Sequence, residues 1–270
     1  MPSLERQGRA LIWMVLVSAL SGCAWLRTVN VLTTEEEVEL GRQFDEKIQK
    51  EMPILDAPAI NEYLQDVVDQ LAQHSVRTDL EYRVRVVDSE EVNAFAVPGG
   101  FLYVNVGLLR AARDEAELAG VLAHEIGHVA ARHGAKALTR QLGLAVLLEL
   151  VRGENPSRSE EVLGALIALG GQGLMLKYSR DEELEADALG VQTLHRAGFD
   201  PEGLTRFFEL LLQESGDVPR AFELFSTHPR TAERIRRTRE LSRKLPPLSN
   251  PRRDSPEFQQ MRRRLPSPSS

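Results

Sequence analysis

The sequence predicts an α+β protein that is mainly helical and carries one small β-sheet. Through most of residues 34–244, apolar residues recur at the spacing of amphipathic helices. Residues 82–104 differ, because β-branched and aromatic residues there flank a Pro-Gly-Gly turn, which indicates strands. With 42% hydrophobic residues, a chain of this length can bury one sizeable core. We therefore expect a single domain over residues 34–244.

The first 22 residues are expected to lie outside this domain as a lipoprotein signal peptide. Arg6 and Arg9 precede an apolar run at residues 10–20, and Leu20-Ser21-Gly22-Cys23 matches a bacterial lipobox. The alternative is an uncleaved membrane anchor. It is disfavoured because this apolar run is short for a bilayer span.

Cys23 is the only cysteine, so an intrachain disulfide is excluded and lipidation is the better explanation for it. Residues 23–33 would then be a tether from the lipid to the domain. Ala24 follows in place of Asp, which favours the outer membrane in a Gram-negative host, with the protein facing the periplasm.

Two helices are expected at the start of the domain. The first begins at Thr34, with Glu37 closing a capping box. The second begins near Pro58, a residue that fits the first turn of a helix. The period then changes, because Val84 and its neighbours alternate with arginines as in a half-exposed strand. Residues 93–106 follow as a strand, a turn and a second strand.

The most informative segment is His124-Glu125-Ile126-Gly127-His128, within a stretch that is expected to be helical from a cap at Asp114. Residues four apart share one face of a helix, so both imidazoles can reach one metal ion. Glu125 is then placed to take a proton from water at that metal. This H-E-x-x-H pattern is the core of a zinc peptidase. The alternative is two helical histidines with unrelated partners.

A catalytic zinc site normally needs a third protein ligand and an open position. A histidine six residues after His128 would supply it in metzincins, but Gly134 stands there and His133 is one residue early. The acidic segment at residues 181–187 offers the other solution, a carboxylate from a second helix, with Glu183 as the candidate ligand. The alternative for this segment is a solvated acidic face.

Other residues of this second helix are expected beside the ligands. Asp187 lies four residues after Glu183 and can accept a hydrogen bond from a ligating histidine. Arg180 lies three residues before Glu183 on the same side, and we expect it next to them.

Together the two motifs resemble one family, the membrane-associated gluzincins that include HtpX, BepA, LoiP and the CAAX prenyl endopeptidases. The shared marks are V-L-A-H-E-I-G-H-V-A-A-R-H at 121–133 and E-L-E-A-D-A-L-G at 183–190. Two weaker ones are N-A-F-A-V-P-G-G at 93–100 and S-T-H-P at 226–229. The resemblance implies a zincin fold with the sheet beside the active-site helix, and one Zn²⁺ per chain.

The resemblance also implies roles for individual residues. By this resemblance the zinc ligands would be His124, His128 and Glu183. Glu125 would be the general base, and Asp187 would contact a ligand without binding the zinc. His228 would act on the substrate carbonyl or cap the zinc in a resting state; a turn or helix-cap role is the alternative. The edge strand that binds the substrate backbone would be Asn93, Ala94, Phe95 and Ala96. An ordinary core hairpin is the alternative for that strand.

Residues 136–176 are rich in Leu, Ala and Gly but reach no uninterrupted apolar run of the ~18 residues that a span requires. We expect buried helices there, interrupted at Gly170-Gly171, and a mobile Gly-rich loop near the cleft as a gate over the active site. A helix is expected at residues 201–212 and a basic helix at about 231–244. Residues 245–270 are rich in Pro, Ser and Arg and are expected to be disordered. No tetratricopeptide period follows the zinc motifs.

Charge is unevenly distributed. The chain has a formal net charge of −7, yet residues 230–270 hold twelve Lys or Arg against four Asp or Glu, a local excess of eight positive charges. This basic end has two interpretations, contact with anionic lipid or an acidic partner, or a solvated helix and tail. Nucleic acid is not expected as a partner, because the body is acidic and no recognition motif is present.

The sequence therefore predicts a zinc metalloendopeptidase of the bacterial cell envelope, anchored to the membrane by lipid. Its expected substrates are misfolded or stalled envelope proteins. The alternative is a periplasmic chaperone or assembly factor that serves the outer-membrane assembly machinery, with proteolysis secondary.

Overall fold

The computed structural model of the chain describes residues 32–169, 176, 178–214, 228 and 232–267. The signal segment, Cys23 and the Gly-rich loop that we expected as a gate lie outside the described residues. In chain order the elements are α2 (Thr34–Glu51), α3 (Pro58–Ala72), β1 (Arg83–Val87), β2 (Ala94–Val97), β3 (Phe101–Asn105), α4 (Val106–Ala111), α5 (Glu115–Ala130), α6 (His133–Leu142), α7 (Leu144–Arg152), α8 (Pro156–Leu169), α9 (Arg180–Arg196), α10 (Gly203–Glu214), α12 (Ala232–Lys244) and α13 (Pro256–Arg263). The predicted α+β class with one small sheet is confirmed.

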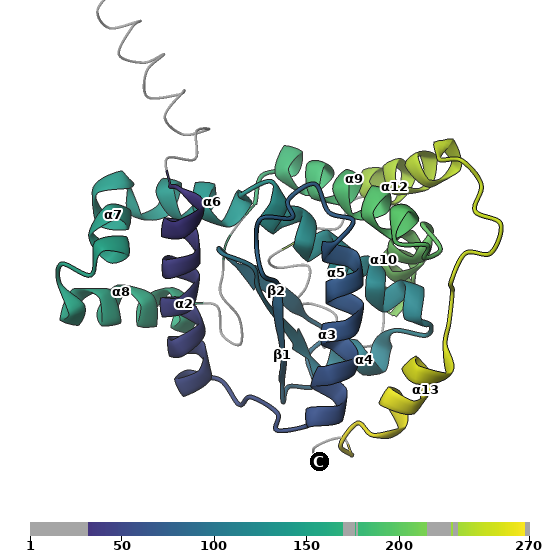
Figure 1. Cartoon of the computed structure of the whole chain (residues 1–270), viewed down its shortest axis with the longest axis horizontal. Coiled ribbons are helices and arrows are strands. Elements are labelled where there is room, and N and C mark those ends of the chain that lie inside the picture. The colour runs from purple at the N-terminus through teal and green to yellow at the C-terminus, as the bar shows by residue number, and fades with distance from the viewer. Residues whose placement is uncertain (1–31, 170–175, 177, 215–227, 229–231, 268–270) are drawn as a thin grey trace, which may run out of the picture.

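A three-stranded sheet forms the centre of the molecule, with helices on both sides (Figure 1). The strand order is β1-β3-β2, with β1 parallel and β2 antiparallel to β3. Hence β2, the predicted substrate strand, lies at an edge of the sheet. Its four residues are nevertheless buried, and β2 packs beside α5.

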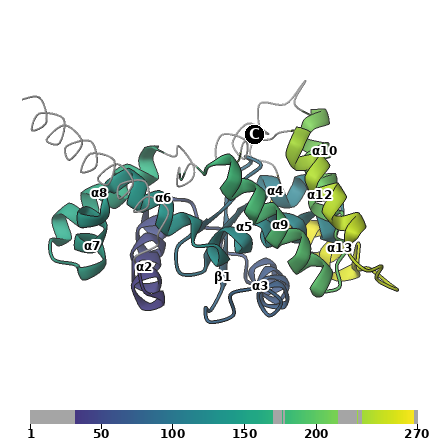
Figure 2. The same ribbon diagram turned by 90° about the horizontal axis from the view of Figure 1, so that it is seen from above.

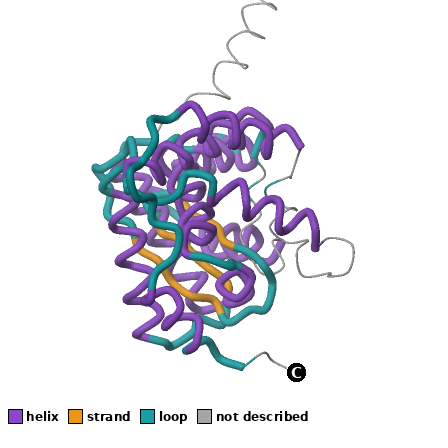
Figure 3. Tube along the Cα trace, turned by 90° about the vertical axis from the view of Figure 1, so that its right-hand side faces the viewer, coloured by secondary structure: helices purple, strands orange, loops and turns teal. Residues whose placement is uncertain are grey.

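The alternation of side chains along the strands divides the core into two clusters. Val86, Leu102 and Val104 face one cluster, together with α3, α5, α9 and α10. Phe95 and Tyr103, stacked at 4.8 Å, face the other, with α2, α6, α7 and α8. Figure 3 shows the strands enclosed by helices, as expected for a sheet that buries both faces.

Two sequence predictions about the chain's ends require correction. Helix α2 starts at Thr34 as predicted, but Thr33 is its cap and Glu36 closes the capping box. Glu37 is instead buried and paired with Arg77. The structure also contradicts the disordered tail, because α13 forms within it.

Helix α13 is held by core packing. Phe258 is fully buried and Met261 nearly so, and both join the cluster around α3. The preceding strand-like segment pairs with Phe199, and the Arg252 guanidinium lies 3.8 Å from the centre of that ring. Composition predicted disorder because arginines and prolines dominate the tail, whereas two apolar side chains at helical spacing provide its anchorage.

Among the described residues, no helix is both long and apolar enough to cross a lipid bilayer.

Helices α5 and α9, which carry the two motifs, pack closely against each other, and glycines at their interface allow this (Figure 2). A Cβ atom on Gly127 would lie 2.8 Å from the carbonyl oxygen of Ala186. One on Gly190 would lie 3.1 Å from the backbone nitrogen of His124. Because side chains at these positions would force the helices apart, glycine sets the distance between the two motif helices.

We predict that Gly127→Ala destabilises the protein by about 1–3 kcal/mol, the usual cost of overpacking a core. Urea unfolding measures the change. Gly164→Ala is the matched control, since a Cβ at that helical position meets only the flexible side chains of Lys47, at 3.4 Å, and Glu51, at 3.7 Å. Equal stability of the two variants would show that the α5–α9 crossing tolerates extra volume.

Candidate metal centre

Helix α5 presents the H-E-x-x-H residues on a buried surface. The Asp114 side chain caps the helix by accepting a hydrogen bond from the Glu117 backbone, as predicted. His124, Glu125 and His128 are each at most 3% exposed. The Nε2 atoms of the two histidines lie 3.1 Å apart, so both imidazoles point to one spot.

Helix α9 brings the carboxylate to that spot. Ser179 caps it, and Glu182 closes a capping box that starts the helix just before the acidic motif. One oxygen of Glu183 lies 3.6 Å from His124 Nε2 and the other 3.5 Å from His128 Nε2. The sequence expectation that two separate helices converge here therefore agrees with the geometry.

His228 comes from neither helix, yet it joins the cluster. Its Nδ1 lies 3.3 Å from His124 Nε2 and 3.0 Å from Glu183 Oε1. One donor atom from each of His124, His128, Glu183 and His228 lies within 4.8 Å of the other three. Burial alone would lower the pKa of His228, but the nearby carboxylates of Glu183 and Glu125 outweigh burial and raise it.

These four groups fit a divalent metal ion. Tetrahedral zinc with bonds of about 2.0–2.1 Å has ligand atoms roughly 3.3 Å apart, which is close to the separations between these donors. Imidazole nitrogens and one carboxylate are also a donor set that such ions accept. Without a cation, several lone pairs would face one another in a buried space, which is costly. The residues thus have the chemistry and the spacing of a metal site.

Glu125 lies beside the cluster without being part of it. Its Oε1 is 3.6 Å from His228 Nε2, and neither of its oxygens accepts a hydrogen bond from any described group. Burial raises the pKa of this carboxyl above its ordinary value. A carboxylate with free lone pairs beside a metal site is suited to proton transfer.

Behind His124 stands a carboxylate that is itself held by an arginine. The Oδ1 atom of Asp187 lies 3.0 Å from His124 Nδ1, as predicted for this residue. Arg234, from α12, donates from Nε and Nη2 to the two oxygens of Asp187, both at 2.7 Å. Burial would raise the pKa of Asp187, but Arg234 outweighs it and lowers the pKa to about 2. Asp187 is therefore ionised at neutral pH.

The prediction for Arg180 is wrong, and Arg234 occupies the place we expected for it. Arg180 is exposed at the start of α9 and donates to Glu233 at 2.7 Å. The buried Arg234 contacts both acidic residues of α9, with Nη1 2.6 Å from Glu183 Oε2. No spacing rule links Arg234 to the motifs. The only signal was its position six residues after His228.

Two further residues of the centre escaped sequence reasoning. The Tyr178 ring stacks on His128 with centroids 4.0 Å apart and an angle of 26° between the planes. His133, which fails the metzincin spacing, is fully buried with Nδ1 3.0 Å from His128 Nδ1. Both residues contact the candidate ligand His128 and not the metal position itself. Rules for the spacing of metal ligands therefore do not identify them.

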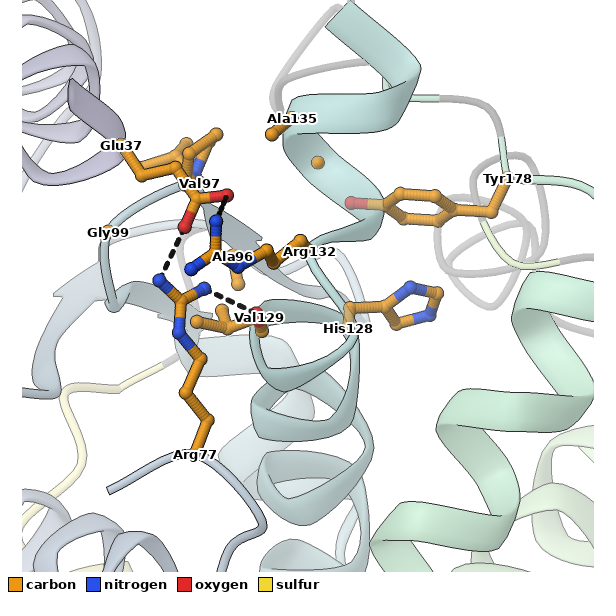
Figure 4. Close-up of a pocket in the computed structure, with 12 residues that line it drawn as sticks. Glu37, Arg77, Ala96, Val97, Gly99, His128, Val129, Arg132, Ala135 and Tyr178 are labelled. Atoms are coloured by element: carbon orange, nitrogen blue, oxygen red, sulfur yellow. Dashed lines mark hydrogen bonds and ion pairs between the residues drawn. The ribbon is translucent and has the colours of Figure 1, made fainter. Parts of the chain in front are cut away.

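A small cavity of about 10 Å³ adjoins the centre (Figure 4). His128 and Tyr178 line one side, and the end of β2 lines another through Ala96 and Val97. Figure 4 shows the Tyr178 ring over His128 with its hydroxyl directed into this space. The cavity thus lies between the candidate ligand His128 and the edge strand.

Asn93, the first residue of the predicted substrate strand, directly precedes β2 and is 1% exposed. Neither polar atom of its side-chain amide has a hydrogen-bond partner among the described residues. Ala94, Phe95 and Ala96 follow as part of β2. The structure thus places three of the four predicted residues on an edge strand beside α5 and the fourth, Asn93, directly before it.

We predict that Arg234→Met lowers the free energy of unfolding by about 3–5 kcal/mol, because it leaves buried carboxylates without their counter-charge. Arg180→Met is the matched control, and its exposed ion pair with Glu233 should contribute far less. Chemical denaturation of both variants provides the comparison. If the two lose equal stability, the buried arginine does not hold this centre together.

Comparisons with known proteins agree with the geometry. A profile of "Peptidase family M48" matches residues 58–242. The beta-barrel assembly-enhancing protease of Escherichia coli (strain K12) is 29% identical over 226 residues, which cover 81% of this chain and 46% of that protein. The mitochondrial metalloendopeptidase OMA1 of Schizosaccharomyces pombe is 34% identical over 181 residues, 66% of this chain and 52% of that protein.

A third relative, the metalloprotease YcaL of Escherichia coli (strain K12), is 30% identical over 163 residues, which cover 60% of this chain and 62% of that protein. The chain thus spans about half the length of the first two relatives and less than two thirds of the third. The profile match covers more than half of the chain and includes both motif helices. The protein therefore belongs to peptidase family M48.

Proposed function

We propose that this protein is a zinc-dependent endopeptidase of the bacterial cell envelope. The observation that carries the proposal is the buried cluster of three imidazoles and one carboxylate, with the free carboxylate of Glu125 beside it. A metal position and a proton acceptor side by side are what peptide hydrolysis requires. The names of the relatives, a metalloendopeptidase among them, support the same reaction class.

In the proposed mechanism, His124, His128 and Glu183 hold the metal. A bound zinc ion supplies polarisation of the scissile carbonyl and lowers the pKa of a water molecule toward about 7. Glu125 accepts the water proton at a carboxylate oxygen and then delivers it to the leaving amine. Its pKa, raised by burial, suits a group that must both take and release a proton. Asp187 holds His124 in the required tautomer.

We assign His228 a capping role in the resting enzyme. Its Nδ1 occupies the fourth corner of the donor set, which hydrolysis needs for water or substrate. His228 belongs to neither α5 nor α9, so its withdrawal leaves the other three donors in place. The raised pKa of His228 also fits this neighbourhood of carboxylates.

The substrate is proposed to add as a strand to β2. An edge strand offers unpaired backbone groups to an extended peptide, and β2 borders the cavity beside His128. The unpartnered amide of Asn93 is a candidate for hydrogen bonding to that peptide. The alternative, a core hairpin without substrate contact, is favoured by the burial of all four β2 residues.

The proposed location follows from the lipobox in the sequence. Lipidation of Cys23 would tether the domain to a membrane, with the outer membrane as the favoured one. Misfolded or stalled envelope proteins are the proposed substrates, and a link to outer-membrane assembly is suggested by the name of the Escherichia coli relative.

A second candidate function is a chaperone or assembly factor that binds client proteins through the same edge strand. The relative named for enhancing beta-barrel assembly favours it. The two functions differ in their need for Glu125, since binding alone does not require a proton acceptor.

We predict that Glu125→Gln abolishes peptide hydrolysis and retains zinc. The amide keeps the shape of the carboxylate but cannot accept the proton. Digestion of envelope proteins by wild type and variant, with products identified by mass spectrometry, provides the test. Glu62→Gln, the same change at an exposed position on α3, is the control. Full hydrolysis by the Glu125 variant would refute the mechanism, and rescue of a deletion strain by it would favour the chaperone function.

We also predict that His228→Ala binds zinc more weakly than wild type and cleaves a short peptide faster, because it removes the capping donor. Zinc affinity and initial rate are measured on the same preparation. Unchanged affinity with a slower rate would contradict capping and point to a role at the substrate carbonyl.

A further inference from the structure

His133 is a buried imidazole beside the metal centre to which the mechanism gives no role. It opens helix α6 and is fully buried. Its Nδ1 lies 3.0 Å from Nδ1 of His128, and its Nε2 lies 3.2 Å from Oε2 of Glu185. The three side chains form a line from a candidate metal ligand to the surface, where Glu185 is 57% exposed.

The positions of the hydrogens on His128 and His133 follow from the proposed role of His128 as a metal ligand. Its Nε2 points into the cluster, 3.1 Å from His124 Nε2. The lone pair on this nitrogen must therefore face the metal position. A neutral imidazole then carries its hydrogen on Nδ1. His128 Nδ1 therefore donates to His133 Nδ1, which must accept. The remaining hydrogen of His133 lies on Nε2 and is donated to Glu185.

The contact of the His128 ring with Tyr178 cannot select the tautomer of His128. Tyr178 stacks on the ring face and restrains the plane of the imidazole. Stacking does not distinguish the two ring nitrogens, however, so it leaves the tautomer undetermined. An acceptor beside one ring nitrogen does distinguish them, and Asp187, 3.0 Å from Nδ1 of His124, is the corresponding group for the other motif histidine.

The backbone between His128 and His133 supports a positioning role for His133. Arg132 adopts a left-handed conformation with φ of 59°, which is uncommon for a residue other than glycine. Its guanidinium is anchored to the Leu32 carbonyl at 2.9 Å and to Thr34 Oγ1 at 3.1 Å. This turn ends α5 and lets α6 fold back, which returns His133 to the ring of His128. The strained turn is therefore maintained by contacts from α2.

We propose that His133 is a positioning residue of the metal centre, which fixes the tautomer and ring orientation of His128 by accepting its Nδ1 hydrogen. Glu185 completes the line by accepting from His133. The two histidines of the motif are thus supported differently, His124 by a carboxylate directly and His128 by a carboxylate through a second imidazole. The inference rests on the proposed metal dependence, and concerns how this chain holds the ion.

The experiment compares zinc affinity of the full mature chain and three variants by competition with a chromophoric chelator. His133→Leu removes the acceptor, whereas His133→Asn keeps an acceptor oxygen near the position of Nδ1. His74→Leu, at an exposed histidine of the α3 end, is the matched control. Unfolding of each metal-free protein is measured in parallel, and the absorption spectrum of cobalt-substituted protein reports the ligand geometry.

We expect His133→Leu to bind zinc about 10–100-fold more weakly, the usual effect of losing such a partner. His133→Asn should retain most of the affinity and the wild-type cobalt spectrum, and His74→Leu should match wild type. Wild-type affinity in His133→Leu would overturn the inference, as would an Asn variant as weak as the Leu variant. If wild type binds no zinc, the proposed function fails as well, so the two failures are distinguishable.

Discussion

The structure depends on the convergence of buried donor groups on one position, from α5, from α9 and from His228. Three imidazole nitrogens and a carboxylate lie within 4.8 Å of one another in a small interior cluster, where unpaired polar groups are costly. A divalent cation bound at its centre would remove that cost by attracting each of the donor atoms. The packing of α5 against α9 is consequently inseparable from the chemistry, because the glycine contacts that bring these helices together also set the distance from Glu183 to His124 and His128.

Around this centre lies a layer of partners that contact the candidate ligands. Arg234 neutralises two carboxylates at once and thereby links α12 to α9. Asp187 restrains His124, while Tyr178 and His133 restrain His128 from the face and from the edge. Such partners orient ligands before the metal arrives and so reduce the entropic cost of binding. The sheet contributes an edge strand beside α5, and the remaining helices supply the core that keeps these parts in register.

Sequence reasoning identified what short-range rules can express. The spacing of His124 and His128, the acidic motif around Glu183 and the cap at Asp114 all lie within single helices, where periodicity and capping chemistry apply. It failed where partners are distant in sequence. Arg180 shares a helix with Glu183 but points to solvent, whereas Arg234 reaches the site from a segment that sequence reasoning had assigned only as a basic helix. Similarly, the arginine-rich composition of the tail predicted disorder, whereas Phe258 and Met261 are buried by contacts with residues distant in sequence.

The most direct test of the metal centre is X-ray absorption spectroscopy at the zinc edge on the purified mature chain. One zinc per chain with a shell of nitrogen and oxygen atoms at about 2.0–2.1 Å, and the scattering signature of three imidazoles, is the expected result. A protein without bound metal, or a zinc ion with fewer than two imidazoles, would contradict the convergence of these helices on a common ion.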